Sequence, residues 1–243
     1  MGLPPNLISA LRSSSQTVVL TGSGISAESG VPTFREAQTG LWERFDPQEL
    51  ATPEAFEHDP GLVWEWYMWR RKLIAQASPN PGHLAIAEMQ DLDQNLIVVT
   101  QNVDGLHQRA GSRDVIELHG NILRAKCSVE GVEVEEFEDS ASPPLCPSCG
   151  APLRPDVVWF GEMLPPGALE VASEAARAAD LFFSVGTSSL VYPAAALPYE
   201  ALESGATLVE VNPEETPLTP HADHALRGPA GDVLPRLIRE LLE

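Results

Sequence analysis

The chain has 243 residues, of which 43% are hydrophobic and 21% charged, so it can bury the core of one large domain, or of a main domain with a smaller one inserted. No apolar run approaches the roughly 18 residues that a membrane span needs. Residues 1–11 show neither the basic start nor the apolar stretch of a signal peptide, and we therefore expect a cytoplasmic protein. The formal net charge of −20 argues against nucleic acids and anionic membranes as partners and favours basic ones, such as lysine-rich peptide segments.

Four short apolar runs predict buried parallel strands, at residues 17–20, 96–100, 181–185 and 207–211. Each is rich in β-branched or aromatic residues and has little polar alternation, as expected when both faces of a sheet are covered. Residues 115–118 and 157–160 are weaker strand candidates. Helical patterns at 62–75, 83–90, 168–179 and 194–204 alternate with the strands, and the last of them stops at Gly205. This alternation predicts a doubly wound, mostly parallel α/β sheet.

Two stretches, 36–80 and 124–154, fit this alternation poorly. We interpret them as insertions that form a smaller domain, made of a helical module and a zinc-ribbon-like module. The large sheet is then built from residues 1–35, 81–123 and 155–243. In a doubly wound sheet, ligands bind outside the carboxyl ends of the strands, so we expect the turns after the four clear strands to form the site.

Residues 22–27 read GSGISA and match the pattern G-x-G-x-x-[GA] directly after the first predicted strand. Gly22 and Gly24 permit a tight turn and let backbone N–H groups approach a pyrophosphate. The pattern alone fits a dinucleotide site and a purely structural turn equally well. No acidic residue closes a second strand about 20 residues later, because Glu43 and Asp46 lie in what reads as loop and helix, and this argues against hydride transfer.

The loop continues to Thr33, Phe34 and Arg35. An aromatic ring followed by a cation is suited to closing over an anionic cofactor. The alternative is a surface loop in which Arg35 pairs with a carboxylate.

Residues 22–35 resemble the NAD loop of the sirtuin family. Residues 100–107 (TQNVDGLH), 117–121 (ELHGN), 160–162 (FGE), 186–188 (GTS) and 211–212 (VN) resemble further sirtuin motifs in the same order. The resemblance extends from about residue 17 to the segment 228–232, which is nearly the whole chain. Ser23 departs from the family, which usually has Ala there, but both residues are small.

This resemblance implies that NAD is consumed as a co-substrate. In sirtuins the acyl oxygen of a modified lysine attacks the ribose as nicotinamide leaves, an alkylimidate forms, and a ribose hydroxyl then attacks it. The products are free lysine, nicotinamide and O-acyl-ADP-ribose. The expected partners are therefore acylated lysine segments of other proteins. The oligomeric state is left open.

The reaction needs one base that accepts a proton near neutral pH, and histidine is the side chain best suited to this. His119 follows a probable strand and precedes Gly120, where the backbone can turn into a cleft. A lone histidine is more often structural, but the motif around His119 favours the catalytic base. The sequence has no G-x-S-x-G motif, in agreement with a reaction that uses no serine nucleophile.

The resemblance also assigns the contacts to NAD. Asn102 and Asp104 would hold the nicotinamide carboxamide, although both residue types also form turns. Gln101 would reach the ribose hydroxyls, and residues after the later strands would contact phosphate, ribose or adenosine. The complete expected set is Gly22, Ser23, Gly24, Glu28, Thr33, Phe34, Arg35, Gln101, Asn102, Asp104, Gly186, Thr187, Ser188, Asn212, Pro213, Glu214 and Ala230.

Residues 62–71 hold three Trp and one Tyr within six residues, followed by two Arg. On a helix Tyr67 and Arg70 are three apart and face the same side. A guanidinium beside a phenol makes a good carboxylate receptor. The sirtuin branch that removes succinyl and malonyl groups has a Tyr-x-x-Arg pair in its acyl pocket, which Tyr67 and Arg70 match. The alternative is an Arg70 that extends from an aromatic core to solvent.

The three cysteines predict a structural metal site. Cys146 and Cys149 form a C-x-x-C knuckle, and Cys127 lies nineteen residues before it, a spacing typical of zinc sites. The residue at the position of the expected fourth cysteine is Glu130. Zinc accepts carboxylate oxygen, so a site of three thiolates and one carboxylate is one interpretation, and a metal-free loop held by packing is the other.

Two further functions remain possible on these residues. One is a sirtuin-like ADP-ribosyltransferase, which would share the NAD site and His119. The other is a non-catalytic NAD-sensing module on the same fold. The pair Tyr67 and Arg70 favours deacylation over the first, and the intact His119, Asn102 and Asp104 argue against the second.

Overall fold

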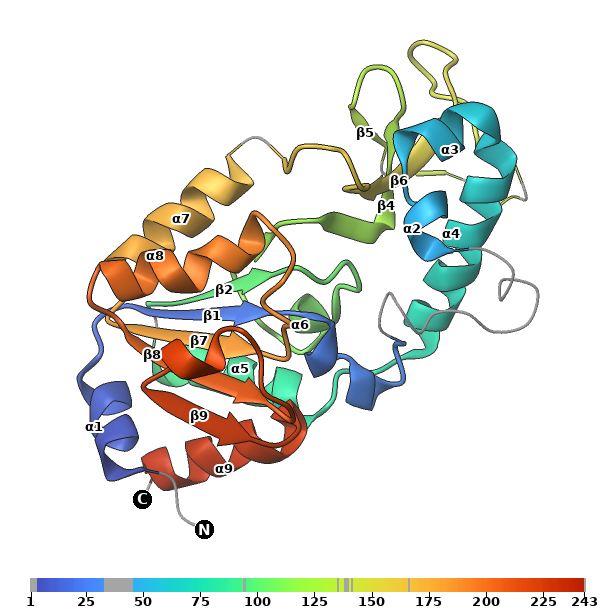
Figure 1. Ribbon diagram of the computed structural model, residues 1–243. Coiled ribbons are helices and arrows are strands. Elements are labelled where there is room, and N and C mark those ends of the chain that lie inside the picture. Colours follow the sequence, from blue (N-terminus) through green and yellow to red (C-terminus); the bar gives the residue numbers. More distant parts are fainter. Residues whose placement is uncertain are drawn as a thin grey trace.

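The computed structural model describes residues 4–32, 46–93, 95–134, 136–137, 140, 142–165 and 167–242. These residues form two sheets with helices around them (Figure 1). The larger sheet has six strands in the order β3-β2-β1-β7-β8-β9, and the smaller has three in the order β5-β4-β6. Among the described residues no helix is long and apolar enough to cross a membrane.

The six strands of the large sheet are β1 (Thr17–Thr21), β2 (Leu96–Thr100), β3 (Val115–Glu117), β7 (Leu181–Val185), β8 (Thr207–Asn212) and β9 (His224–Arg227). Every pair of neighbours runs parallel. The strand order reverses at β1, which pairs with β2 on one side and β7 on the other. This is the position where doubly wound sheets bind their ligands.

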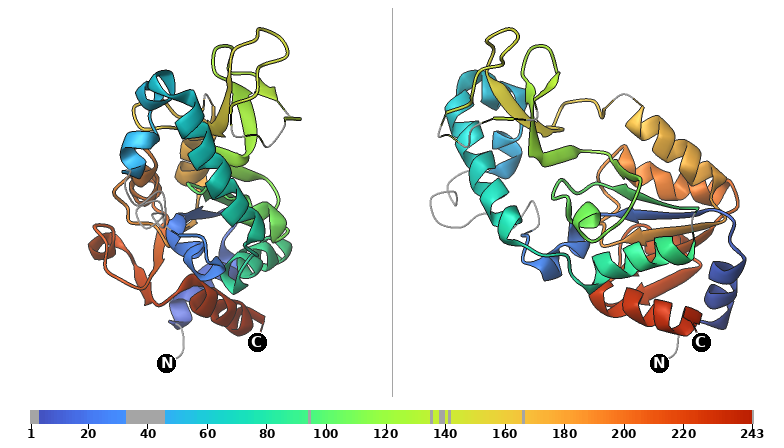
Figure 2. Two further views of the ribbon diagram at one scale, coloured as in Figure 1. Left: turned by 90° about the vertical axis from the view of Figure 1, so that its right-hand side faces the viewer. Right: turned by 180° about the vertical axis from the view of Figure 1, so that it is seen from behind.

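Helices cover both faces of the large sheet (Figures 1 and 2). On one face lie α1 (Pro5–Ser13), α5 (Pro81–Leu92) and α9 (Ala230–Leu242), and on the other α7 (Ala168–Ala178) and α8 (Leu197–Glu203). Successive side chains of β1 enter different cores: Val19 packs with the α5 and α9 side, while Val18 and Leu20 pack with the α7 and α8 side. Both faces are apolar because both are covered. The predicted doubly wound α/β fold is confirmed.

The small sheet, β4 (Gly120–Cys127), β5 (Glu133–Val134) and β6 (Leu153–Val157), packs with α2 (Pro47–Leu50), α3 (Pro53–His58) and α4 (Pro60–Gln76). Their shared core is rich in tryptophan. The Thr52 hydroxyl caps α3 by accepting the Ala55 N–H at 3.1 Å, and the Asp59 carboxylate caps α4 by accepting the Leu62 N–H at 3.0 Å. Each cap is followed by a proline, which suits the first helical turn.

The structure differs from the sequence prediction in several elements. Of the candidate strand 157–160, only Val157 is in a strand, and that strand is β6 of the antiparallel sheet. The predicted helix 194–204 is divided into a 3₁₀ turn, η4 (Ala194–Ala196), and α8. No predicted element corresponds to α1, β9 or α9. The division into a large and a small domain stays a prediction, and β4 runs across its proposed boundary at residues 123–124.

Candidate active site

The turns after three strands of the large sheet are joined by backbone hydrogen bonds. The N–H of Gly24 donates to the Gly186 carbonyl at 2.8 Å, and the N–H of Gln101 donates to the Thr21 carbonyl at 3.0 Å. Gly186 in turn donates to the Val211 carbonyl at 2.9 Å. The loops after β1, β2 and β7 therefore meet at one edge of the sheet, next to the end of β8.

Glycine is required where two of these loops touch. A Cβ atom on Gly24 would lie 2.6 Å from the Gly186 carbonyl oxygen, and one on Gly22 would lie 2.9 Å from the same atom. Gly186 itself has φ +60° and leaves no room for a Cβ atom, which would lie 2.5 Å from the Ile25 nitrogen. The N–H groups of Gly22 and Gly24 donate to the carbonyls of Val185, the last residue of β7, and of Gly186, which follows it. Contact between the loops is thus sufficient to explain both glycines.

A buried polar network lies beneath the glycine loop. Ser26 is buried, with 2% of its surface exposed. Its hydroxyl donates to the Asp104 carboxylate at 2.7 Å. The Asn102 amide donates to the Ser26 hydroxyl at 3.1 Å and to the Gly22 carbonyl at 3.0 Å. Burial raises the pKa of Asp104, and hydrogen bonds from Ser26 and from the Leu106 N–H oppose this rise. The structure therefore brings Asn102 and Asp104 together with the glycine loop.

His119 lies in the short link between β3 and β4. Its Nδ1 atom is 2.9 Å from the Gln101 carbonyl oxygen. A carbonyl only accepts, so Nδ1 carries the proton and Nε2 has the lone pair that can take up another. Burial lowers the pKa of His119, and the hydrogen bond to Gln101 opposes this fall. The ring is consequently neutral at pH 7, as a general base must be.

The link around His119 needs a glycine next to it. Gly120 has φ +77°, and a Cβ atom there would lie 2.2 Å from the Asp156 carbonyl oxygen. The His119 carbonyl accepts the Val158 N–H at 2.9 Å. The histidine backbone is therefore held against the segment that follows β6.

Other predicted cofactor residues line the same edge of the sheet. The Gln101 amide donates to the Thr187 hydroxyl at 3.1 Å, and the Asn212 amide donates to the Thr187 carbonyl at 2.9 Å. Ser23, Ser188, Pro213 and Glu214 are exposed. Thr33, Phe34 and Arg35 lie outside the described residues.

Glu28 lies against the start of α9, the helix that begins at Ala230. The Glu28 carboxylate accepts the N–H of Gly231 at 2.8 Å, one residue after Ala230. A carboxylate is stabilised at a helix N-terminus by the free N–H groups and the helix dipole. This contact gives Glu28 a structural partner in addition to the cofactor role predicted for it.

Two histidines and Ser26 join the site without having been singled out from the sequence. The rings of His83 and His107 lie 4.9 Å apart between centroids. His107 Nε2 is 2.9 Å from the Thr21 hydroxyl, and His83 Nε2 is 3.4 Å from the Ser26 hydroxyl. Burial lowers the pKa of His83 to about 4 and that of His107 to about 3. His107 is the last residue of the TQNVDGLH motif, and this position in the motif is the sequence feature that could have indicated its place in the site.

Tyr67 and Arg70 are both buried on one side of α4, with 3% and 8% of their surface exposed. The Tyr67 hydroxyl accepts the indole N–H of Trp159 at 3.0 Å, and the Arg70 guanidinium lies 4.9 Å from the centroid of the Trp66 ring. Burial raises the pKa of Tyr67 to about 12, partly opposed by Arg70. Burial also lowers the pKa of Arg70, and Tyr67 opposes this. Arg70 does not extend to solvent, contrary to the alternative considered from the sequence.

The predicted metal ligands converge. One ligand atom from each of Cys127, Glu130, Cys146 and Cys149 lies within 4.8 Å of all the others. The Cys127 and Cys149 sulfurs are 3.4 Å apart, and the Glu130 N–H donates to the Cys127 sulfur at 3.3 Å. Tetrahedral zinc with Zn–S bonds of about 2.3 Å places its sulfurs about 3.8 Å apart. The donor set and its spacing fit structural zinc.

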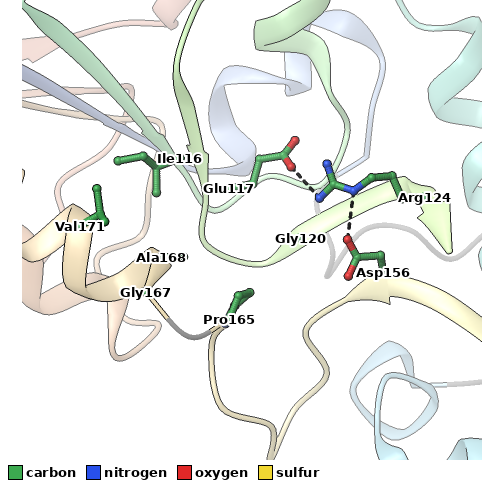
Figure 3. Close-up of a pocket in the computed structure, with 9 residues that line it drawn as sticks. All are labelled: Ile116, Glu117, Gly120, Arg124, Asp156, Pro165, Gly167, Ala168 and Val171. Carbon is green, nitrogen blue, oxygen red and sulfur yellow. Dashed lines mark hydrogen bonds and ion pairs between the residues drawn. The ribbon is translucent and has the colours of Figure 1, made fainter. Parts of the chain in front are cut away.

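A pocket of about 420 Å³ lies beside β3 and the start of α7 (Figure 3). None of the predicted cofactor, acyl or metal residues lines it. Its polar wall is formed by Arg124, which bridges the carboxylates of Glu117 and Asp156. Its apolar wall includes Ile116 and Val171.

Known proteins are similar to this chain, in sequence and in structure, over almost its whole length. A deacylase of Pyrobaculum aerophilum, named NAD-dependent protein deacylase 2, is 56% identical over 237 residues, which cover 97% of this chain and 95% of the relative. An NAD-dependent protein deacylase of Aquifex aeolicus is 55% identical over 228 residues, with coverage of 93% and 95%. A crystal structure of a Sir2 homologue with NAD is similar with a TM-score of 0.92 and 47% identity, covering 99% of this chain and 94% of that one. The profile of the Sir2 family matches residues 22–193. The chain belongs to the Sir2 family.

Proposed function

We propose that this protein is an NAD-dependent protein deacylase that prefers lysines carrying a negatively charged acyl group, such as succinyl or malonyl, and acts more weakly on acetyl-lysine. Proteins that are 55% and 56% identical to it carry the name NAD-dependent protein deacylase. NAD supplies the leaving nicotinamide and the ribose that accepts the acyl group. The neutral imidazole of His119 accepts the proton of the ribose hydroxyl through Nε2.

The loops at the edge of the large sheet bind NAD in this proposal. The buried Asn102 and Asp104 hold the nicotinamide carboxamide, and Gln101 reaches the ribose beside His119. The turns at Thr187 and Asn212 contact the rest of the dinucleotide. The convergence of these loops supports the assignment, because each of them is hydrogen-bonded to a neighbour.

The observation that supports the acyl preference is the burial of Arg70 among aromatic rings, beside the phenol of Tyr67. A guanidinium in such surroundings favours an anionic ligand, because the low dielectric strengthens its attraction to a carboxylate. The Tyr67 hydroxyl is fixed by Trp159, directly before the predicted motif 160–162. A charge-assisted hydrogen bond is worth about 1.5–3 kcal/mol, or roughly tenfold to over a hundredfold in discrimination.

The partners in this proposal are acylated lysine segments of other proteins. A Sir2 variant that is 35% identical, with a TM-score of 0.83, has been solved with a deacetylated p53 peptide and 3′-O-acetyl ADP-ribose. The net charge of −20 favours the basic surroundings that lysine-rich segments provide. Zinc on Cys127, Glu130, Cys146 and Cys149 completes the protein in a structural role.

The test compares succinyl-, acetyl- and unmodified lysine in peptides of one sequence, with NAD, by nicotinamide release and peptide mass. Arg70→Met should lower kcat/KM for the succinyl peptide at least tenfold and change that for the acetyl peptide much less. Arg71→Met is the matched control, because it removes the same charge from the next residue of α4, whose guanidinium packs on Phe137.

Equal losses on both peptides in Arg70→Met would refute the receptor role, as would a wild-type preference for acetyl-lysine. Mass added to the protein or peptide would indicate ADP-ribosyl transfer. The absence of nicotinamide release with every peptide would indicate an NAD-sensing module.

A further inference from the structure

The carboxylate of Glu117 is the centre of a cluster directly before His119. One of its oxygens accepts the Gln108 amide at 2.7 Å and the Asn121 amide at 2.6 Å. The other lies 2.8 Å from an Arg124 nitrogen. The Glu117 side chain is only 11% exposed, whereas Gln108 and Arg124 reach it from the surface. The carboxylate itself is thus largely shielded from water, which strengthens the hydrogen bonds that it accepts.

One of these contacts encloses the backbone that carries His119. Glu117 is the last residue of β3, and Asn121 is the second residue of β4. Their side-chain hydrogen bond closes the segment 117–121 into a loop around the histidine. The Asn121 side chain also accepts the Leu123 N–H at 2.9 Å and is itself buried. The loop is therefore fixed at both ends by Glu117 and Asn121.

Arg124 connects the same carboxylate to the small sheet (Figure 3). Its guanidinium lies 3.0 Å from Asp156 on β6 and 3.4 Å from Glu133 on β5. Lys126 adds a second ion pair to Asp156 at 3.2 Å. Glu117 belongs to the parallel sheet, so Arg124 is an ion-pair bridge between the two sheets at the position where the chain passes from one to the other.

We propose that Glu117 is a positioning residue for His119, and that Arg124 couples this position to the small sheet. The proposal rests on the role of His119 as the base in the proposed deacylation. Neither residue touches the reacting atoms. They hold the imidazole so that Nδ1 stays on the Gln101 carbonyl and Nε2 faces the ribose hydroxyl.

This role predicts a specific kinetic defect. In the proposed reaction nicotinamide leaves before the base takes up a proton from the ribose hydroxyl. A displaced His119 slows transfer of the acyl group and leaves the earlier loss of nicotinamide intact, and a displacement of about 1 Å is enough to lower a rate about a hundredfold. A merely structural Glu117 would lower both reactions together, along with the Tm.

The experiment measures two rates in Glu117→Gln, which keeps the shape of the side chain but replaces an acceptor oxygen by a donor. The first is kcat for formation of deacylated peptide, and the second is incorporation of labelled nicotinamide into NAD in the presence of acylated peptide. Deacylation should fall at least tenfold, while incorporation of the label and the KM for NAD stay within about threefold of the wild type. Arg124→Gln should show a smaller loss of the same kind.

Arg113→Ala is the control, because it removes an exposed arginine whose 2.9 Å ion pair with Asp91 lies outside this cluster, and both of its rates should stay unchanged. If Glu117→Gln does not fold, Gln108→Ala removes one donor from the same carboxylate and should show a weaker selective loss. Equal losses in both rates, or none, in these variants would overturn the positioning role. Failure of both reactions in the wild-type protein would refute the proposed deacylase function itself, and this inference with it.

Discussion

The contact between the two glycine-bearing loops gives a quantitative prediction for Gly24→Ala. The new Cβ atom would lie 2.6 Å from the Gly186 carbonyl oxygen, where Cβ atoms in proteins stay beyond 3.0 Å, an overlap of 0.4 Å (3.0 − 2.6). Its next neighbours are also backbone atoms of Gly186, so no flexible side chain can move aside. Overpacking of this kind destabilises a protein by about 1–3 kcal/mol.

For a chain of this length about 2 kcal/mol corresponds to a fall in Tm of roughly 4–8 °C. The loops must also separate, so the affinity for NAD should fall more than stability alone explains. Calorimetric unfolding and titration with NAD measure the two effects. Gly61→Ala is the matched control: its Cβ atom would meet nothing nearer than 3.4 Å, and on a helix it should stabilise the protein by about 0.4–1 kcal/mol. An unchanged Tm and NAD affinity in Gly24→Ala would refute the account of this contact.

Four further predictions concern the titratable groups and the metal site. Burial lowers the pKa of His119, so the base stays neutral to lower pH, and the acid limb of the kcat/KM profile should lie below about pH 6.5; a limb above pH 7 would contradict this. His119→Asn should abolish deacylation while calorimetry still detects NAD binding. The pKa of His83 falls to about 4 and that of His107 to about 3 on folding, so the unfolded chain binds more protons below pH 6.5, and each ring should remove about 2 kcal/mol of stability between pH 6.5 and 5. Denaturant unfolding of His107→Gln should accordingly depend less on pH than the wild type, and equal pH dependence would count against the buried neutral ring. Chelators should remove zinc and lower the Tm, with Glu130→Ala losing metal fastest and Glu130→Cys slowest; equal release rates would exclude Glu130 as a ligand.

The central strands could be predicted because their buried residues follow one another directly in the sequence. Val18 and Val19 enter cores on opposite faces, so an uninterrupted apolar run is the direct consequence of a covered sheet. The edge strand β9 gives no such signal, because it is short and partly exposed, and its Arg227 pairs with the buried Glu210 of β8. Its pairing depends on a distant residue that the local sequence does not reveal.

The small sheet was predicted only as an insertion. β4 contains the charged Arg124, whose partners lie on β3, β5 and β6. A charged residue whose partners lie on other strands makes its own strand look like a surface loop when only the neighbouring residues in the sequence are considered. The run 157–160 was wrongly predicted as a strand because its residues are apolar. Trp159 is buried by the contact of its side chain with Tyr67 of α4, and not by a place in a sheet.

Sequence motifs identified Gly24, Asn102 and His119 as candidate site residues, whereas the side-chain contacts that surround them could not be predicted. Ser26 contacts Asp104, which lies in the loop after β2, and approaches His83, which lies in the first turn of α5, and both are far from Ser26 in the sequence. A small hydroxyl in a glycine-rich loop has no pattern that reveals such partners. The structure supplies what spacing cannot, which is the set of side chains that meet across the switch point of the sheet.

The position of His119 between the two sheets has a mechanical consequence. Only Leu118 and His119 separate β3 from β4, so the two sheets cannot move far apart at this point. A second tie holds the carboxyl end of α4, where the Arg109 guanidinium donates to the carbonyls of Ile74 at 3.2 Å and Ala77 at 2.5 Å. The helix that carries Tyr67 and Arg70 and the link that carries His119 are therefore anchored to the large sheet separately.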